Sequence, residues 1–82
     1  MPNLSYLRSR RREQELVNSY RSMGWIAARS AGSKSEVDVF AINRADGEVR
    51  LIQIKTKKGG RSLKKRLVWS KGQVEFWWYS YE

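Results

Sequence analysis

Three polar side chains interrupt two short apolar stretches in the middle of the chain. Asp38 stands near the start of the stretch Val37–Ile42, and Gln53 and Lys55 stand near the end of the stretch Val49–Thr56. Because successive side chains of a strand point to opposite faces, Gln53 and Lys55 share one face of the second stretch. An acid, an amide and an amine can therefore converge at one place.

A second acid lies in the predicted N-terminal helix, roughly 9–23. Glu13 falls on the same helical face as Leu16, Val17 and Tyr20, whereas Glu15 points to the opposite side. A carboxylate in line with an apolar stripe is unusual, because burying an unpaired charge is costly. Either Glu13 complements the helix dipole in the first turn, or it reaches the polar residues of the strands.

Together these residues fit metal-assisted cleavage of a phosphodiester bond. The carboxylates of Glu13 and Asp38, with the side-chain oxygen of Gln53, are the oxygen ligands that Mg²⁺ prefers. A bound metal activates water, and Lys55 can stabilise the charge that develops in the transition state. The competing interpretation is an ordinary ion pair between Asp38 and Lys55. The absence of cysteine and histidine excludes thiolate and imidazole metal sites and histidine catalysis.

The net charge is +9 over 82 residues, which indicates a polyanionic partner, most often nucleic acid. The segment 57–66 is predicted to be a flexible basic loop that grips the phosphate backbone; a merely solvated charge run is the alternative. The candidate DNA-binding residues are Arg10, Arg11, Arg12, Arg29, Lys34, Lys57, Lys58, Arg61, Lys64 and Lys65. No apolar run reaches the length of a membrane span and no signal peptide is visible, so we expect a soluble, cytoplasmic protein without a membrane partner.

The remaining signals predict one domain over residues 1–82. Residues 1–8 look loose, the first helix ends at Gly24, and a first strand covers Trp25–Arg29. Asp46 and Gly47 form the strongest hairpin signal, between the two central strands. Those strands are apolar on both faces, as expected for strands that helices or a partner cover on both sides.

The C-terminal quarter predicts a short strand at 67–69 followed by a helix. The segment Ser70–Gln73 has the form of a capping box. The apolar residues after it follow a helical spacing up to the last residue but one of the sequence: Val74, Trp77, Trp78 and Tyr81. Core packing is the first interpretation of this stripe, a subunit interface is the second and base stacking is the third.

Several of these motifs together resemble the archaeal-type Holliday junction resolvases of the restriction-endonuclease-like PD-(D/E)xK superfamily. The motifs, in matching order and spacing, are Arg11-Arg12-Glu13, Gly24-Trp25, Arg29-Ser30-Ala31-Gly32-Ser33, Val37-Asp38-Val39 and Leu51-Ile52-Gln53-Ile54-Lys55. The resemblance implies a restriction-endonuclease-like α/β fold with an N-terminal helix, a central mixed β-sheet of about four strands and a C-terminal helix.

The resemblance also implies an activity and a set of roles. A homodimer, joined here through the C-terminal aromatic helix, would use Mg²⁺ or Mn²⁺ to nick a four-way DNA junction. Glu13, Asp38 and Lys55 match catalytic positions of the family, and Ser33 matches a serine of its active-site loop. Arg29 matches an arginine that contacts DNA or supports the site.

Three positions depart from the pattern of the family. Val37 stands where a proline is usual, and Gln14 where an arginine usually follows the helix glutamate. Gln53 stands where the motif has its second acid. The leading hypothesis is therefore a metal-dependent, structure-selective DNA endonuclease. The alternatives are a minimal nuclease on other DNA and an inactive, basic DNA-binding module, which Gln53 motivates.

Overall fold

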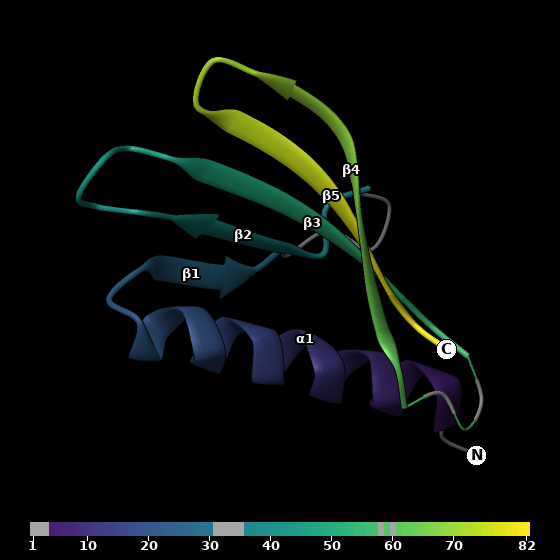
Figure 1. Ribbon diagram of the computed structural model, residues 1–82. Helices are drawn as coiled ribbons and strands as arrows, with labels where there is room; N and C mark the ends of the chain where they lie inside the picture. Colours follow the sequence, from purple (N-terminus) through teal and green to yellow (C-terminus); the bar gives the residue numbers. More distant parts are fainter. Residues whose placement is uncertain (1–3, 31–35, 58, 60) are drawn as a thin grey trace.

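The fold is a mixed β-sheet with one helix packed on it. The computed structural model describes residues 4–30, 36–57, 59 and 61–82. In these residues the elements are α1 (Leu4–Ser22), β1 (Ile26–Arg29), β2 (Val39–Ile42), β3 (Val49–Thr56), β4 (Leu63–Lys71) and β5 (Val74–Tyr81). The strand order is β1-β2-β3-β5-β4, in which β3 and β5 are parallel and the other neighbours are antiparallel (Figure 1).

The helix covers one side of the sheet. α1 packs against β1, β2 and β3, and the β4–β5 hairpin curves away beyond the helix (Figure 1). We call the sheet face that α1 covers the inner face and the opposite face the outer face. The mixed α/β fold with an N-terminal helix is as predicted, and the sheet has five strands where about four were expected.

The core lies between α1 and the inner face. Val17 of the helix and Val39 and Ile52 of the sheet are at most 1% exposed, and burying each such side chain contributes about 1.5–3 kcal/mol. The Tyr20 and Tyr79 hydroxyls lie 3.2 Å apart in a buried hydrogen bond. This bond ties α1 to the middle of β5, and Arg12 over the Tyr81 ring adds a second contact near the end of that strand.

The turns that frame the first four elements are as predicted. After Ser22, Gly24 adopts a φ of 89°, and the Trp25 backbone N–H donates to the Tyr20 carbonyl (3.0 Å). Between β2 and β3, the Glu48 N–H donates to Asp46 Oδ1 (2.8 Å), and Gly47 has a φ of 78°. These turns hold α1 against β1 and set the register of the central hairpin.

The start of the helix differs from the prediction. α1 begins at Leu4, so residues 4–8 are helical where a loose segment was expected. The cause is a run rich in leucine and arginine, both good helix formers, without glycine or proline after Pro2. Glu13 therefore lies well inside α1, whose first turn holds no acid. Complementing the helix dipole in the first turn is not its role.

The predicted C-terminal helix is wrong, because residues 74–81 form β5. β5 pairs with β3 from Val74 to Tyr81, and the segment read as a capping box is the turn between β4 and β5. Valine, phenylalanine, tryptophan and tyrosine favour strands, and a short apolar run cannot be assigned from its spacing alone. The predicted stripe is consequently divided: Trp77 and Tyr81 face inward, and Val74 and Trp78 face outward.

Two further predictions for this half change with it. β4 begins at Leu63, so residues 63–66 of the predicted basic loop belong to a strand, and the short strand at 67–69 is the middle of β4. Within the described residues, no helix covers the outer face, which leaves a partner as the cover expected for that side of the central strands. None of the described helical segments is long and apolar enough to cross a membrane.

Replacing Gly72 tests the hairpin directly. Gly72 has a φ of 60°, which an L side chain rarely adopts. Gly72→Ala should lower the free energy of unfolding by about 1 kcal/mol, measured by urea denaturation. Gly72→Asn, which tolerates this conformation better, should lose less. A stabilising Gly72→Ala substitution would instead fit an exposed helical position and contradict the hairpin.

Candidate active site

The Asp38 carboxylate is held in place just before the first residue of β2. The Asp38 N–H donates to the Ile52 carbonyl (2.9 Å), and the Asp38 carbonyl accepts from the Ser30 N–H (2.8 Å). One step further along β3, the Ile54 N–H donates to Asp38 Oδ2 (2.8 Å). The side chain thus replaces the next backbone acceptor of the ladder, which holds the carboxylate at the end of the sheet.

Glu13 approaches this carboxylate from the inner side. It is half-buried on α1, on the face that also carries Leu16 and Val17. Burial raises the pKa of the Glu13 carboxyl, and the negative charge of Asp38 raises it further, while Arg29 and Arg10 act in the opposite direction. Two carboxylates that repel each other form a place where a cation is stabilised.

Gln53 and Lys55 reach the same end of the sheet from the outer face. Gln53 is half-buried and lies beside Trp78 of β5, its register partner. Lys55 is exposed, and its Nζ lies 4.2 Å from the centre of the Trp78 ring, a cation–π distance. None of the ion pairs among the described residues joins Asp38 to Lys55, so the ordinary ion-pair interpretation finds no support.

The donor set is small but of the right type for a hard cation. Among the described residues, no three acidic side chains come together closely enough to form a metal cluster. Glu13 and Asp38 would be the two carboxylate ligands, and Gln53 would add a neutral oxygen. Such oxygen ligands fit Mg²⁺, which binds through one or two carboxylates and retains several waters.

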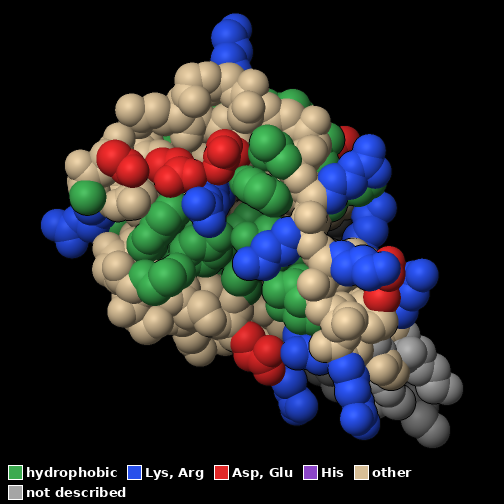
Figure 2. Space-filling view, viewed as in Figure 1, with side chains coloured by type: hydrophobic (Ala, Val, Ile, Leu, Met, Phe, Trp, Pro, Cys, Tyr) green, Lys and Arg blue, Asp and Glu red, His purple; other side chains and the backbone are tan. Residues whose placement is uncertain are grey.

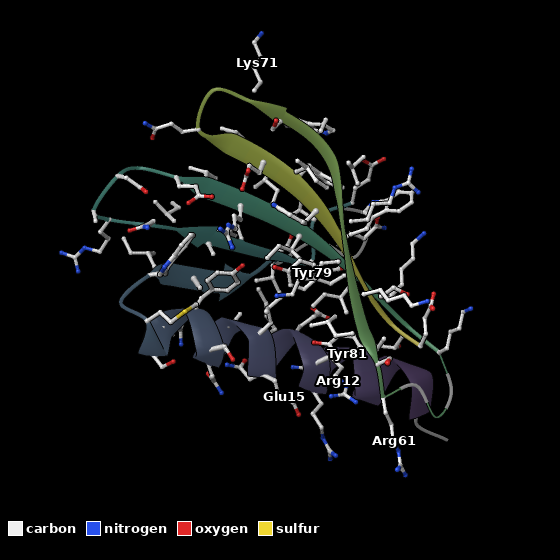
Figure 3. The ribbon with its side chains drawn as sticks, in the orientation of Figure 1. Arg12, Glu15, Arg61, Lys71, Tyr79 and Tyr81 are labelled. Atoms are coloured by element: carbon white, nitrogen blue, oxygen red, sulfur yellow. The ribbon has the colours of Figure 1, made fainter. Side chains whose placement is uncertain are left out.

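Four predicted DNA-binding cations line one cavity beside this site. The cavity, of about 360 Å³, lies between the N-terminal half of α1 and the ends of β3 and β5. Arg12 lies over the Tyr81 ring, 4.5 Å from its centre, and pairs with Glu15 (3.3 Å), as Figure 3 shows. The lining residues are Arg11, Arg12, Glu15, Thr56, Lys57, Gly59, Arg61 and Tyr81.

The other predicted cations are spread over neighbouring elements. Arg10 and Arg29 are close enough to Glu13 to lower its pKa. On β4, Lys64 Nζ lies 3.0 Å from Glu82 Oε2, and Lys65 Nζ lies 5.2 Å from the centre of the Tyr79 ring. Ser33, Lys34 and Lys58 lie outside the described residues.

Acidic side chains gather at one place on the sheet. Figure 2 shows them as a row at the upper left, while Lys and Arg side chains gather along the right and lower edges, with others at the left, at the top and beside the acidic row. Asp46, Glu48 and Glu75 line a second cavity together at the start of β3 and β5, where Arg50 pairs with Glu48 (3.1 Å) and Glu75 (3.6 Å). The candidate site lies toward the opposite end of β3, beside the cavity that Arg11, Arg12, Lys57 and Arg61 line.

Two aromatic and cationic neighbours of the site were missed in the sequence. Trp78 is the register partner of Gln53, and Lys55 Nζ lies over its ring. The guanidinium of Arg66, on β4, also lies over the Trp78 ring, 5.6 Å from the ring centre. Assigning Trp78 to a helix hid this neighbourhood. The signal that would have found it is the outward alternation of Trp78 and Ser80 along a strand.

Comparison with known proteins assigns a class and then a family. A family model described as archaeal Holliday junction resolvase (Hjc) matches residues 5–75, well over half of the chain. The match gives the class, a nuclease that acts on DNA in recombination. The chain belongs to the archaeal Holliday junction resolvase family. No curated protein and no solved structure matches it.

The electrostatic coupling of the two acids can be measured by nuclear magnetic resonance. Asp38→Asn removes a negative charge but keeps an oxygen that accepts from Ile54, so the pKa of Glu13 should fall toward the ordinary value for glutamate. A ¹³C titration of the Glu13 carboxyl would report this change. Glu15→Gln, which removes a charge from the other side of α1, should leave the Glu13 titration in place. An unchanged Glu13 titration in Asp38→Asn would show that the two carboxylates are not neighbours.

Proposed function

We propose that this protein is a metal-dependent endonuclease that nicks four-way DNA junctions. The observation that carries the proposal is the pair of mutually repelling carboxylates, Glu13 and Asp38, at one end of the sheet. Their elements converge there independently, one acid from α1 and the other from the end of β2. The family membership supports DNA, and branched DNA in particular, as the substrate.

Each residue of the site has a distinct role in this proposal. Glu13, Asp38 and the Gln53 side-chain oxygen would hold Mg²⁺ or Mn²⁺, which when bound supplies an activated water and offsets charge on the phosphate. Lys55 lies on the same face as Gln53 and stabilises the developing negative charge or orients the attacking water. The ring of Trp78 keeps the Lys55 ammonium on that face.

The basic surface holds the DNA around this centre. Arg11, Arg12, Lys57 and Arg61 line the cavity next to the end of β3 and would neutralise backbone phosphates. Such contacts release counterions, so binding should weaken steeply as salt concentration rises. Because a junction is resolved by two cuts, we infer a homodimer with one site per subunit. A C-terminal helix cannot form its interface, since residues 74–81 are a strand.

A second candidate function is a DNA-binding module without activity. Gln53 favours it, because a site with two carboxylates attracts a divalent cation less strongly than a site with three. A minimal nuclease that acts on other DNA is the third candidate. Cleavage measurements on several DNA structures separate all three.

The direct test is a junction-cleavage assay with matched variants. The protein with Mg²⁺ or Mn²⁺ should nick a synthetic four-way junction faster than plain duplex. Asp38→Ala and Lys55→Ala should lower the cleavage rate by at least about 100-fold, because each removes a group that acts on the reacting phosphate. Both variants should still bind the junction in a gel-shift assay.

Arg44→Ala is the control for this assay, because Arg44 is exposed in the β2–β3 turn at the far end of the sheet and should leave cleavage unchanged. Binding without cleavage under every divalent metal would identify the inactive module. Faster cleavage of plain duplex would identify the nuclease on other DNA.

Restoring the acid at position 53 tests the proposed metal site separately. Gln53→Glu should lower the Mg²⁺ concentration for half-maximal cleavage several-fold, because a third carboxylate strengthens binding of a divalent cation. Gln73→Glu makes the same charge change in the exposed turn between β4 and β5 and serves as the matched control. Equal metal dependence in the two variants would place Gln53 outside the metal site.

A further inference from the structure

The outer face of the sheet carries a continuous row of apolar side chains. The row crosses four strands through registered neighbours: Phe40, Leu51, Phe76 and Trp69. The next row along the strands holds Gln53, Trp78 and Arg66. The apolar row therefore lies beside the candidate active site, on a face that no described helix covers.

A β-bulge brings Trp69 into this row. The β4–β5 register pairs Arg66 with Trp78 and Trp69 with Phe76, with a shift between Leu67 and Trp69. In a regular strand, Arg66 and Trp69 would point to opposite faces, because Trp69 is the third residue after Arg66 and successive side chains alternate. The extra residue, Val68, places both on the outer face. Bulges that redirect a side chain in this way are common next to functional sites.

The Trp69 ring has one face supported and the other exposed. It stacks on Phe76, with ring centres 5.9 Å apart and planes 19° from parallel, and it remains 47% exposed. Trp78, by contrast, already has Lys55 and Arg66 over its ring. A rigid ring with an exposed face is the surface on which a planar, aromatic ligand stacks.

The charges around Trp69 identify the kind of ligand. Three cations of β4 share its face, namely Lys64, Arg66 and Lys71. The acidic residues Glu48 and Glu75 of this end of the sheet pair with Arg50 on the opposite, inner face. Among the described residues, the one ion pair that β4 forms is Lys64 with Glu82. A second copy of β4 would oppose cations to cations, and lysines on an edge strand resist such pairing. The partner that combines planar rings with negative charge is DNA with unpaired bases.

We propose that the outer face of the β4–β5 hairpin binds unpaired nucleotides of DNA, with one base stacked on Trp69. Arg66, and Lys71 at the tip of the hairpin (Figure 3), would contact the flanking phosphates. From the spacing of strands and of residues along them, Trp69 lies roughly 12 Å from Gln53. The stacked base would therefore lie within a few nucleotides of the cut. This inference rests on the proposed function only in taking DNA as the substrate.

DNA binding is measured in the presence of a metal chelator, so that cleavage of the DNA cannot affect the result. An oligothymidylate should bind the protein, and Trp69→Leu should weaken that binding about tenfold or more, because base stacking is lost. Trp69→Phe keeps an aromatic ring and should retain most of the affinity. Leu67→Ala, on the inner side of the same strand, is the matched control and should bind normally.

An abasic oligonucleotide sharpens the result. If Trp69 stacks on a base, the protein and Trp69→Leu should bind a strand without bases equally, and both should bind plain duplex equally. Deleting Val68 should remove the bulge and leave Trp69 opposite Phe76 on the outer face, so oligothymidylate binding should persist in this variant and still depend on Trp69. Thermal unfolding of each variant shows whether its fold is intact.

Three outcomes would overturn the inference. Trp69→Leu could weaken binding of single strands, abasic strands and duplex alike, which would indicate a structural role. Alternatively, it could change the sedimentation coefficient and leave DNA binding intact, which would assign this face to a second copy. If the protein cleaves the junction normally but binds single-stranded DNA no better than duplex, this inference fails and the proposed function stands. Binding of oligothymidylate without any cleavage would remove the proposed endonuclease alone.

Discussion

The hydrogen bond from the Ile54 N–H to Asp38 Oδ2 is the constraint on which the site depends. β2 begins at Val39, so the β2–β3 ladder stops there, and without this acceptor the N–H of the buried Ile54 would lose its partner. The same carboxylate carries the negative charge that raises the pKa of Glu13. The end of the ladder and the candidate metal site are therefore one feature. Any oxygen acceptor at position 38 can accept the hydrogen bond from the Ile54 N–H. Only a charged carboxylate there can add to the rise in the pKa of Glu13.

This position also explains how the site draws on both sides of a thin sheet. Glu13 comes from the helix on the inner face, and Gln53 and Lys55 come from the outer face. Within the described residues, the Asp38 carboxylate accepts from the Ile54 N–H, and Lys55 Nζ lies over the Trp78 ring of β5; that all four groups meet around one cation belongs to the proposed function. In a chain of 82 residues, one helix covers only part of the sheet. The open half leaves Trp69 exposed beside the site.

The sequence predicted the parts of the fold that depend on local patterns. The face of α1 with Val17 and Tyr20, the bounds of β3 and the turn at Gly47 are confirmed, because each rests on side-chain spacing or backbone conformation within a few residues. The C-terminal strand was missed, because its parallel partner β3 is distant in sequence and its apolar spacing also fits a helix. The bulge at Val68 and the Asp38–Ile54 hydrogen bond depend on register, which the sequence does not reveal.

Gln53 is the point at which chemistry and electrostatics oppose each other. A third carboxylate there would add a stronger metal ligand, but it would also add negative charge to a site in which burial and Asp38 already raise the pKa of Glu13. The same charge would repel the phosphate that the surrounding cations attract. An amide keeps the oxygen and omits the charge. The chain thus combines a candidate site of two carboxylates with a net charge of +9, so in the proposed function its affinity for DNA would rest more on the protein's own cations than on a bound metal.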